Sequence, residues 1–190
     1  MTWTAVLRQL PAQGTIAFRG ANSVNFLPAG PPSGGQWSGV YFGSTTDHSV
    51  GYIELENGVG SLWTAALPQI LPVIFATGTS YGDPTIPGDI KAQHLRQEAA
   101  NLGLNLPDTG QVITDLGSIG YGYVGVDSEG TRELIIGHNL IAAAPVPVTG
   151  TIIAYVNRQN YVNQGWSAVP TGPFNQPQPA NQTSYIQTMT

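Results

Sequence analysis

The sequence predicts a β-rich α+β domain, and three observations support this fold class. Its apolar residues fall into many short runs separated by Gly and Pro, which is typical of strands joined by turns. Only one long segment has the apolar spacing of a helix. The 190 residues include 24 Gly and 15 Pro, too many for a helical bundle or a coiled coil. A chain of this length fits one domain with a substantial core.

The predicted strands are short apolar runs that end at turn residues. They cover residues 15–20, 40–43, 72–77, 112–113, 121–126, 133–137 and 151–156. The segment 121–137 is interpreted as a hairpin, because the residues 127–130 between its two runs form a turn sequence. One or two helical turns are expected at 48–55. The longest helix is expected over 89–102, and Gly103 is placed to end it.

The C-terminal end differs in composition from the rest of the chain. From Pro170 onwards the sequence is rich in Pro, Gln, Asn and Thr and poor in apolar residues. Such a segment gains too little from burial to offset its loss of conformational entropy. We therefore expect a single catalytic domain over 1–169 and a loosely ordered tail over 170–190.

Charge and composition exclude several classes of function. Charged residues make up 9% of the chain, and six Lys and Arg face eleven Asp and Glu for a net charge of −5. We expect no nucleic-acid partner, because binding to a phosphate backbone needs clustered Lys and Arg. The chain has no Cys, and its three His follow no metal-ligand spacing, so we expect no metal and interpret these His as surface or core residues.

Neither a membrane span nor a secretory signal peptide is expected from the sequence. The longest apolar segment, 65–76, is interrupted by Pro68, Gln69 and Pro72, and it falls short of the ~20 apolar residues that a span needs. The first residues, Met1-Thr2-Trp3-Thr4, lack the basic and then apolar regions of a signal peptide.

Three short motifs occur in a suggestive order along the chain. An Arg ends an early strand in Phe18-Arg19-Gly20, an aromatic strand runs into Ser44-Thr45-Thr46, and Glu133 opens an apolar strand after a tight turn. This order resembles the Arg–Ser–Glu class of bacterial mono-ADP-ribosyltransferase toxins, the cholera- and pertussis-like group. The resemblance covers residues 15–157, and the apolar run 134–141 and the strand 152–157 fit the same pattern.

The resemblance implies a fold and a set of catalytic residues. It implies two small packed antiparallel or mixed sheets, with few helices, around a cleft that binds NAD. Arg19 would hold phosphate or ribose oxygens of NAD with two parallel bonds. Glu133 would stabilise the oxocarbenium-like transition state that forms when nicotinamide leaves. Ser44 would hydrogen-bond Glu133 and fix its rotamer.

Further residues receive supporting roles by the same resemblance. Gly20 and Thr45 would line the NAD site, and Tyr81 would stack on nicotinamide. The turn residues Ser128, Glu129 and Thr131 would face the acceptor protein. Many members of the class carry Glu or Gln at the position of Thr131, where that side chain engages the acceptor residue, so this chain departs from the pattern there.

Each motif also has a plain structural interpretation. Arg19 could be a surface ion-pair partner, the segment 44–47 is a good helix cap, and Glu129 competes with Glu133 for the role of the catalytic carboxylate. Two alternative functions stay open. One is an NAD glycohydrolase on the same scaffold, with water as the acceptor. The other is a β-rich module that binds carbohydrate or protein, in which the four Trp serve as ligand platforms.

The resemblance also implies a biological setting. Members of the class are bacterial effectors that are secreted or injected and act in the cytosol of a target cell. A toxic domain of a larger delivery protein, such as a Tc-toxin C subunit, is a fitting source for this chain. We expect a monomer that uses NAD and a target-cell acceptor protein, with actin and small GTPases as candidate acceptors.

Overall fold

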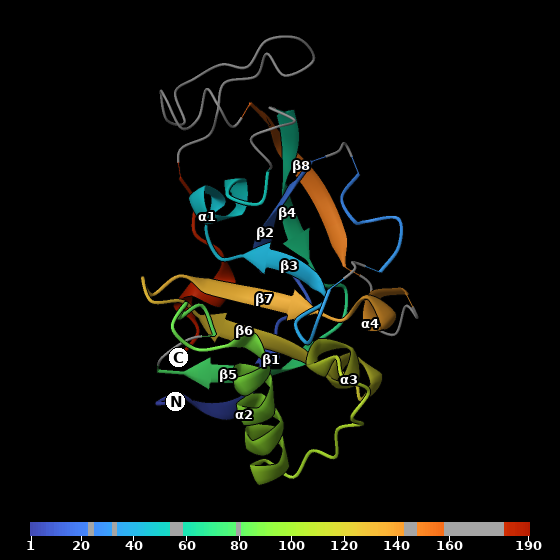
Figure 1. Ribbon diagram of the computed structural model, residues 1–190. Helices are drawn as coiled ribbons and strands as arrows, with labels where there is room; N and C mark the ends of the chain where they lie inside the picture. Colours follow the sequence, from blue (N-terminus) through green and yellow to red (C-terminus); the bar gives the residue numbers. More distant parts are fainter. Residues whose placement is uncertain (23–24, 32–33, 54–58, 79–80, 143–147, 158–180) are drawn as a thin grey trace.

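The computed structural model describes residues 1–22, 25–31, 34–53, 59–78, 81–142, 148–157 and 181–190 (Figure 1). Its strands are β1 (Thr4–Leu10), β2 (Ala17–Ala21), β3 (Val40–Gly43), β4 (Val59–Ala66), β5 (Leu71–Thr77), β6 (Gly122–Val126), β7 (Arg132–Ile136) and β8 (Thr149–Asn157). The helices are α1 (Thr46–Val50), α2 (Gly88–Asn101), α3 (Val112–Ser118) and α4 (His138–Ala142), and a 3₁₀ helix, η3, covers Tyr185–Thr188. The described part is therefore an α+β fold, as the sequence predicts.

The strands form an eight-stranded mixed sheet in the order β1-β5-β6-β7-β3-β2-β4-β8. Neighbouring strands are antiparallel except β5 and β6, which are parallel. The link between β3 and β2 consists of one residue pair, Phe18 with Gly43. In Figure 1, β5, β6 and β7 lie across the view whereas the antiparallel strands β4 and β8 lie steeply between top and bottom, so the sheet changes direction at this joint. The expectation of two separate sheets is corrected to this extent: the described strands are joined into one.

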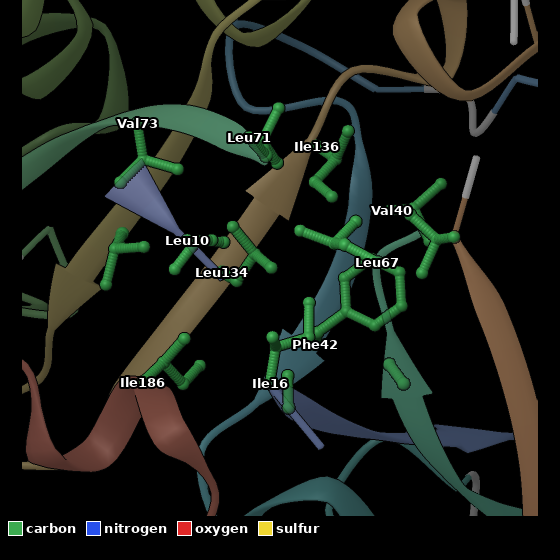
Figure 2. Packing of buried hydrophobic residues seen from close by; sticks show 14 of the residues in the cluster. Leu10, Ile16, Val40, Phe42, Leu67, Leu71, Val73, Leu134, Ile136 and Ile186 are labelled. Atoms are coloured by element: carbon green, nitrogen blue, oxygen red, sulfur yellow. The ribbon is translucent and has the colours of Figure 1, made fainter. Parts of the chain in front are cut away.

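The face on which Glu133 lies follows from the alternation of side chains along β7. Leu134 and Ile136 are buried in the largest core cluster, which Figure 2 shows together with Phe42 of β3. Ile135 is buried in the cluster that α2 and α3 form against the opposite face. Because successive side chains of a strand point to opposite faces, Glu133 lies on the same face as Ile135.

The last ten residues dock against the sheet, so 181–190 differ from the loosely ordered tail expected over 170–190. Ile186 of η3 is fully buried in the largest core cluster (Figure 2). The backbone of Thr183 forms a bridge with that of Thr45, and the Arg132 guanidinium donates hydrogen bonds to the carbonyls of Ile186 and Gln187. Residues 158–180, which include the beginning of the expected tail, lie outside the described residues.

Some elements differ from those that the sequence predicts. The strands β1 and β4 were not expected, and residues 112–113, expected as a strand, begin the helix α3. β1 is an edge strand whose exposed positions are largely polar, so its apolar signal is weak. α3 buries Val112 and Ile113 in the cluster shared with α2, and this packing outweighs the strand preference of β-branched residues. Among the described helices, none is long and apolar enough to cross a membrane.

Candidate active site

Glu133 lies in a space that two glycines leave open. On β7 it is paired with Gly43 of β3 on one side and with Gly125 of β6 on the other. A Cβ atom on Gly43 would come within 2.5 Å of the Ser49 hydroxyl and 3.0 Å of the His48 ring. A Cβ atom on Gly125 would come within 2.6 Å of the Tyr81 ring. Larger residues at either glycine would therefore displace the groups that flank the carboxylate.

The helix α1 and the turn that follows it supply the two described contacts of the Glu133 carboxylate. Thr45 caps this helix, because its hydroxyl accepts a hydrogen bond from the His48 backbone N–H at 3.1 Å. His48 and Tyr52 are four residues apart, a spacing that places side chains one above the other on a helical turn. His48 Nε2 lies 2.6 Å from Glu133 Oε1, and the Tyr52 hydroxyl donates a hydrogen bond to the same oxygen. Both described contacts therefore hold the carboxylate through the same one of its oxygens, Oε1.

Burial and the charges around Glu133 shift the pKa values of its two partners, His48 and Tyr52. Burial lowers the pKa of His48, but the hydrogen bond to Glu133 and the charges of Glu133, Asp127 and Glu129 outweigh this effect, so the pKa is raised. Burial and the charge of Glu133 raise the pKa of Tyr52, whereas the charge of Arg19 lowers it. Tyr52 therefore stays a neutral hydrogen-bond donor at any physiological pH, within the field of both Arg19 and Glu133.

Arg19 lines a cleft at the joint between β2 and β3. Its Nε donates to the Phe26 carbonyl at 2.6 Å and its Nη1 to the Tyr41 carbonyl at 2.9 Å, which fixes the plane of the guanidinium. The guanidinium carbon lies 5.9 Å from the centre of the Phe42 ring. Burial lowers the pKa of Arg19, yet an arginine remains charged. The cleft measures about 380 Å³ and is lined by residues 19–22, 25, 27, 28, 39–41 and 52.

A second pocket adjoins this cleft. It measures about 530 Å³ and is lined by residues 34–39, Tyr41, Gly88 and Asp89. Gly39 and Tyr41 line both hollows, and the Tyr41 hydroxyl donates to the Trp37 carbonyl at 2.8 Å. Both volumes fall in the range of about 300–1,000 Å³ that is usual for small-molecule sites. Together they can take a ligand with two separate lobes.

Ser44 does not contact Glu133, contrary to the expectation. Val40 and Phe42 of β3 point into the largest core cluster, and Ser44 continues on that face, whereas Glu133 pairs with Gly43 on the opposite face. The fully buried Ser44 hydroxyl donates to Gln187 Oε1 at 2.5 Å and accepts from the Arg132 backbone N–H at 3.1 Å. Ser44 thus ties the end of β3 to the C-terminal segment, and His48 and Tyr52 hold Glu133 instead.

The other residues expected in the NAD site take different places. Thr45 caps α1, so the plain structural interpretation of residues 44–47 as a helix cap is correct at this position. Gly20 lines the Arg19 cleft, and a Cβ atom there would clash with the Ser49 carbonyl. The Tyr81 ring is stacked on Trp37 with the centroids 5.1 Å apart and lies close to Gly125. Tyr81 flanks Glu133, but one face of its ring is covered by Trp37.

The turn before Glu133 is internally braced. The Asp127 carboxylate accepts hydrogen bonds from the backbone N–H groups of Glu129 at 2.9 Å and Thr131 at 2.7 Å. Ser128 and Glu129 are exposed, and Thr131 is half-buried. Glu129 is not a partner in the described contacts of Glu133, but its charge acts on the pKa of His48. The turn therefore lies close enough to the His48–Glu133 pair for its charges to act on His48.

Sequence reasoning missed His48, Tyr41 and Tyr52. His48 was interpreted as a surface or core residue because it lacked metal spacing. A signal was present: His48 and Tyr52 lie four residues apart in a segment that the sequence predicts to be helical. Of the Trp platforms in the binding-module alternative, Trp3 is buried in the core, Trp37 is stacked on Tyr81 and also lines the second pocket, and Trp166 lies outside the described residues.

Comparison with known proteins gives no match from which a function could be inferred. No protein-family model matches the chain, and a search of curated proteins finds no significant match. The arrangement of Arg19, Tyr52, His48 and Glu133 therefore carries the functional argument. Chemically, it offers a fixed cation in a cleft and a braced carboxylate next to a histidine.

Proposed function

We propose that this chain cleaves NAD between nicotinamide and ribose and transfers the ADP-ribosyl group to an acceptor protein. The observation that carries the proposal is the link between Arg19 and Glu133. Tyr52 lines the cleft that contains Arg19 and donates a hydrogen bond to the Glu133 carboxylate. Two of the three residues that the resemblance singles out as catalytic thus meet around one tyrosine, although they lie far apart in the sequence.

Arg19 suits a dinucleotide because its guanidinium is fixed and charged. Two of its five N–H donors are used by backbone carbonyls, so the plane of the group does not turn when an anion binds. NAD would supply the diphosphate that this cation pairs with and the glycosidic bond that is broken. The adjoining hollows of about 380 and 530 Å³ match a ligand with two nucleoside lobes.

Glu133 is suited to stabilise positive charge on the ribose. The described hydrogen bonds to its carboxylate end on Oε1, and the Glu133 side chain is 14% exposed. In such a sheltered place a carboxylate acts strongly on charge that develops in the transition state. His48 and Tyr52 prevent the carboxylate from rotating away, which is the role that the resemblance gives to Ser44.

Hydrolysis of NAD by water is a second candidate function. The observation that favours it is Thr131, a hydroxyl side chain at the position where the class carries the Glu or Gln that engages an acceptor. A hydroxyl is a poor general base, so a protein acceptor receives less help there. Actin and small GTPases stay candidate acceptors, and a secreted or injected effector that acts in a target-cell cytosol is the setting that we propose.

One incubation tests both candidates. The chain is mixed with NAD labelled in the adenylate part and with a eukaryotic cell lysate, and labelled protein and free nicotinamide are measured together. We expect a labelled protein band and nicotinamide release. Nicotinamide without labelled protein would indicate the glycohydrolase, and no nicotinamide would contradict the proposed function. The Glu133→Gln variant is the matched negative control.

A further inference from the structure

The protonation state of the His48 ring follows from its contact with Glu133. An ionised carboxylate can only accept hydrogen bonds, so the imidazole must donate through Nε2, which lies 2.6 Å from Oε1. In the neutral ring the proton is therefore on Nε2, and Nδ1 carries a lone pair. A carboxylate partner on one nitrogen raises the basicity of the other. His48 is thus prepared to take up a proton at Nδ1.

The surroundings of His48 keep it close to both solvent and the reacting carboxylate. Its side chain is 25% exposed, whereas that of Glu133 is 14% exposed. The Tyr52 ring packs edge-on against the imidazole at 5.6 Å. The charged groups that act on His48 are Glu133 of β7 and Asp127 and Glu129 of the turn before β7. These three carboxylates favour the protonated ring after it has accepted a proton.

We propose that His48 is the general base that activates the nucleophile which attacks the ribose. The inference rests on the proposed function and adds a catalytic residue to it. As the C1–nicotinamide bond breaks, its electron pair stays on the nicotinamide nitrogen, which leaves neutral. The nucleophile forms a new bond to C1 and loses its proton to Nδ1 of His48, which later releases it to solvent.

His48 thereby fills a role for which the turn offers no suitable side chain. Thr131 precedes Glu133 by two residues and carries a hydroxyl, a weak base. The Asp127 carboxylate accepts the backbone N–H groups of Glu129 and Thr131 through one oxygen, Oδ1. His48, in contrast, contacts the Glu133 carboxylate directly.

A comparison of two nucleophiles tests the assignment. Water must lose a proton when it attacks, whereas azide is already an anion and needs no base. The chain is incubated with NAD and sodium azide, and the ratio of ADP-ribosyl azide to ADP-ribose is measured for wild type and His48→Gln. The Gln side chain can still donate to Glu133 Oε1 but has no basic nitrogen. General-base catalysis contributes about 10²–10⁴-fold, so we expect the azide ratio to rise at least about tenfold.

Controls separate failure of this inference from failure of the proposed function. Glu133→Gln should lower both products, ADP-ribosyl azide as well as ADP-ribose, because breaking the bond to nicotinamide needs the carboxylate whichever nucleophile attacks. An unchanged ratio in a folded His48→Gln variant would overturn the assignment of His48. Absence of nicotinamide release by wild type would instead overturn the proposed function and with it this inference.

A second measurement needs no variant. For wild type, formation of ADP-ribose should decline as the pH falls through the pKa of His48, while azide attack, followed over a range where azide stays ionised, should not follow that decline. Identical pH profiles for the two products would contradict a base at His48.

Discussion

Replacement of Ile186 by alanine should destabilise the protein although the residue lies only four positions before Thr190. Ile186 is fully buried among residues of several strands (Figure 2). Its neighbour Tyr185 is 43% exposed and provides a matched control in the same 3₁₀ helix. Truncating a buried isoleucine to alanine costs about 2–5 kcal/mol, because apolar contacts are lost and a cavity remains.

The expected shift in melting temperature follows from the size of the domain. For a domain of about 150–250 residues, 1 kcal/mol corresponds to about 2–4 °C. Ile186→Ala should therefore melt at least about 4 °C below wild type, and Tyr185→Ala should melt close to it. Thermal unfolding followed by circular dichroism measures both. Equal melting temperatures for wild type and Ile186→Ala would show that the C-terminal segment does not contribute to the core.

The remaining predictions concern the site. Arg19→Lys should lose nearly as much NAD affinity as Arg19→Ala in calorimetric titrations, because an ammonium group lacks the planar fork that bonds two carbonyls at once; full affinity in the Lys variant would contradict this. The pKa of His48 is raised by folding, so its stabilisation should be complete below about pH 6.5 and disappear as the pH rises through the folded-state pKa. Urea unfolding of wild type and His48→Gln should accordingly differ most at acidic pH and converge at alkaline pH; a constant difference would refute it. Ser128→Gly combined with Thr131→Ala should weaken labelling of an acceptor protein and spare nicotinamide release, and a parallel loss of both would assign the turn to the active site itself.

Local sequence patterns predicted the parts of the fold that local forces determine. The long helix is expected over 89–102 and found at Gly88–Asn101, because polar and apolar residues alternate there with helical spacing. The hairpin around Asp127 follows from the residues of its turn. The Asp127 carboxylate accepts hydrogen bonds from backbone N–H groups of the turn, as Asp side chains in turns commonly do. The class of fold could therefore be inferred from the sequence.

The elements that the sequence did not predict depend on packing between residues that lie far apart in the chain. The C-terminal segment is poor in apolar residues, yet one of them, Ile186, fills a place in a core built from distant strands. Composition averages over the segment and does not detect its two buried anchors, Ile186 and Met189. The strand β4 was missed for a similar reason: its Gly and Ala residues carry little strand preference, and its pairing with β2 and β8 holds it in the sheet.

The candidate site was predicted in part. The sequence pointed to Arg19 and Glu133, and the structure connects them through Tyr52. It also led to Ser44 as the partner of Glu133, which the alternation of side chains along β3 rules out. Motif order does not specify the face of a strand on which a residue lies. The contact between His48 and Glu133 depends on how α1 packs against β2 and β3, next to β7, which no spacing in the sequence encodes.

The measurement that tests the central claim most directly is nicotinamide release by two matched glutamine variants. Glu133→Gln preserves the shape of the side chain and its capacity to accept hydrogen bonds from Tyr52 and His48, but it removes the charge. Loss of one transition-state electrostatic partner costs about 10²–10³ in rate, so release should fall at least about a hundredfold, whereas Glu129→Gln in the exposed turn should stay near wild type. Near-normal release by a folded Glu133→Gln variant would contradict the account.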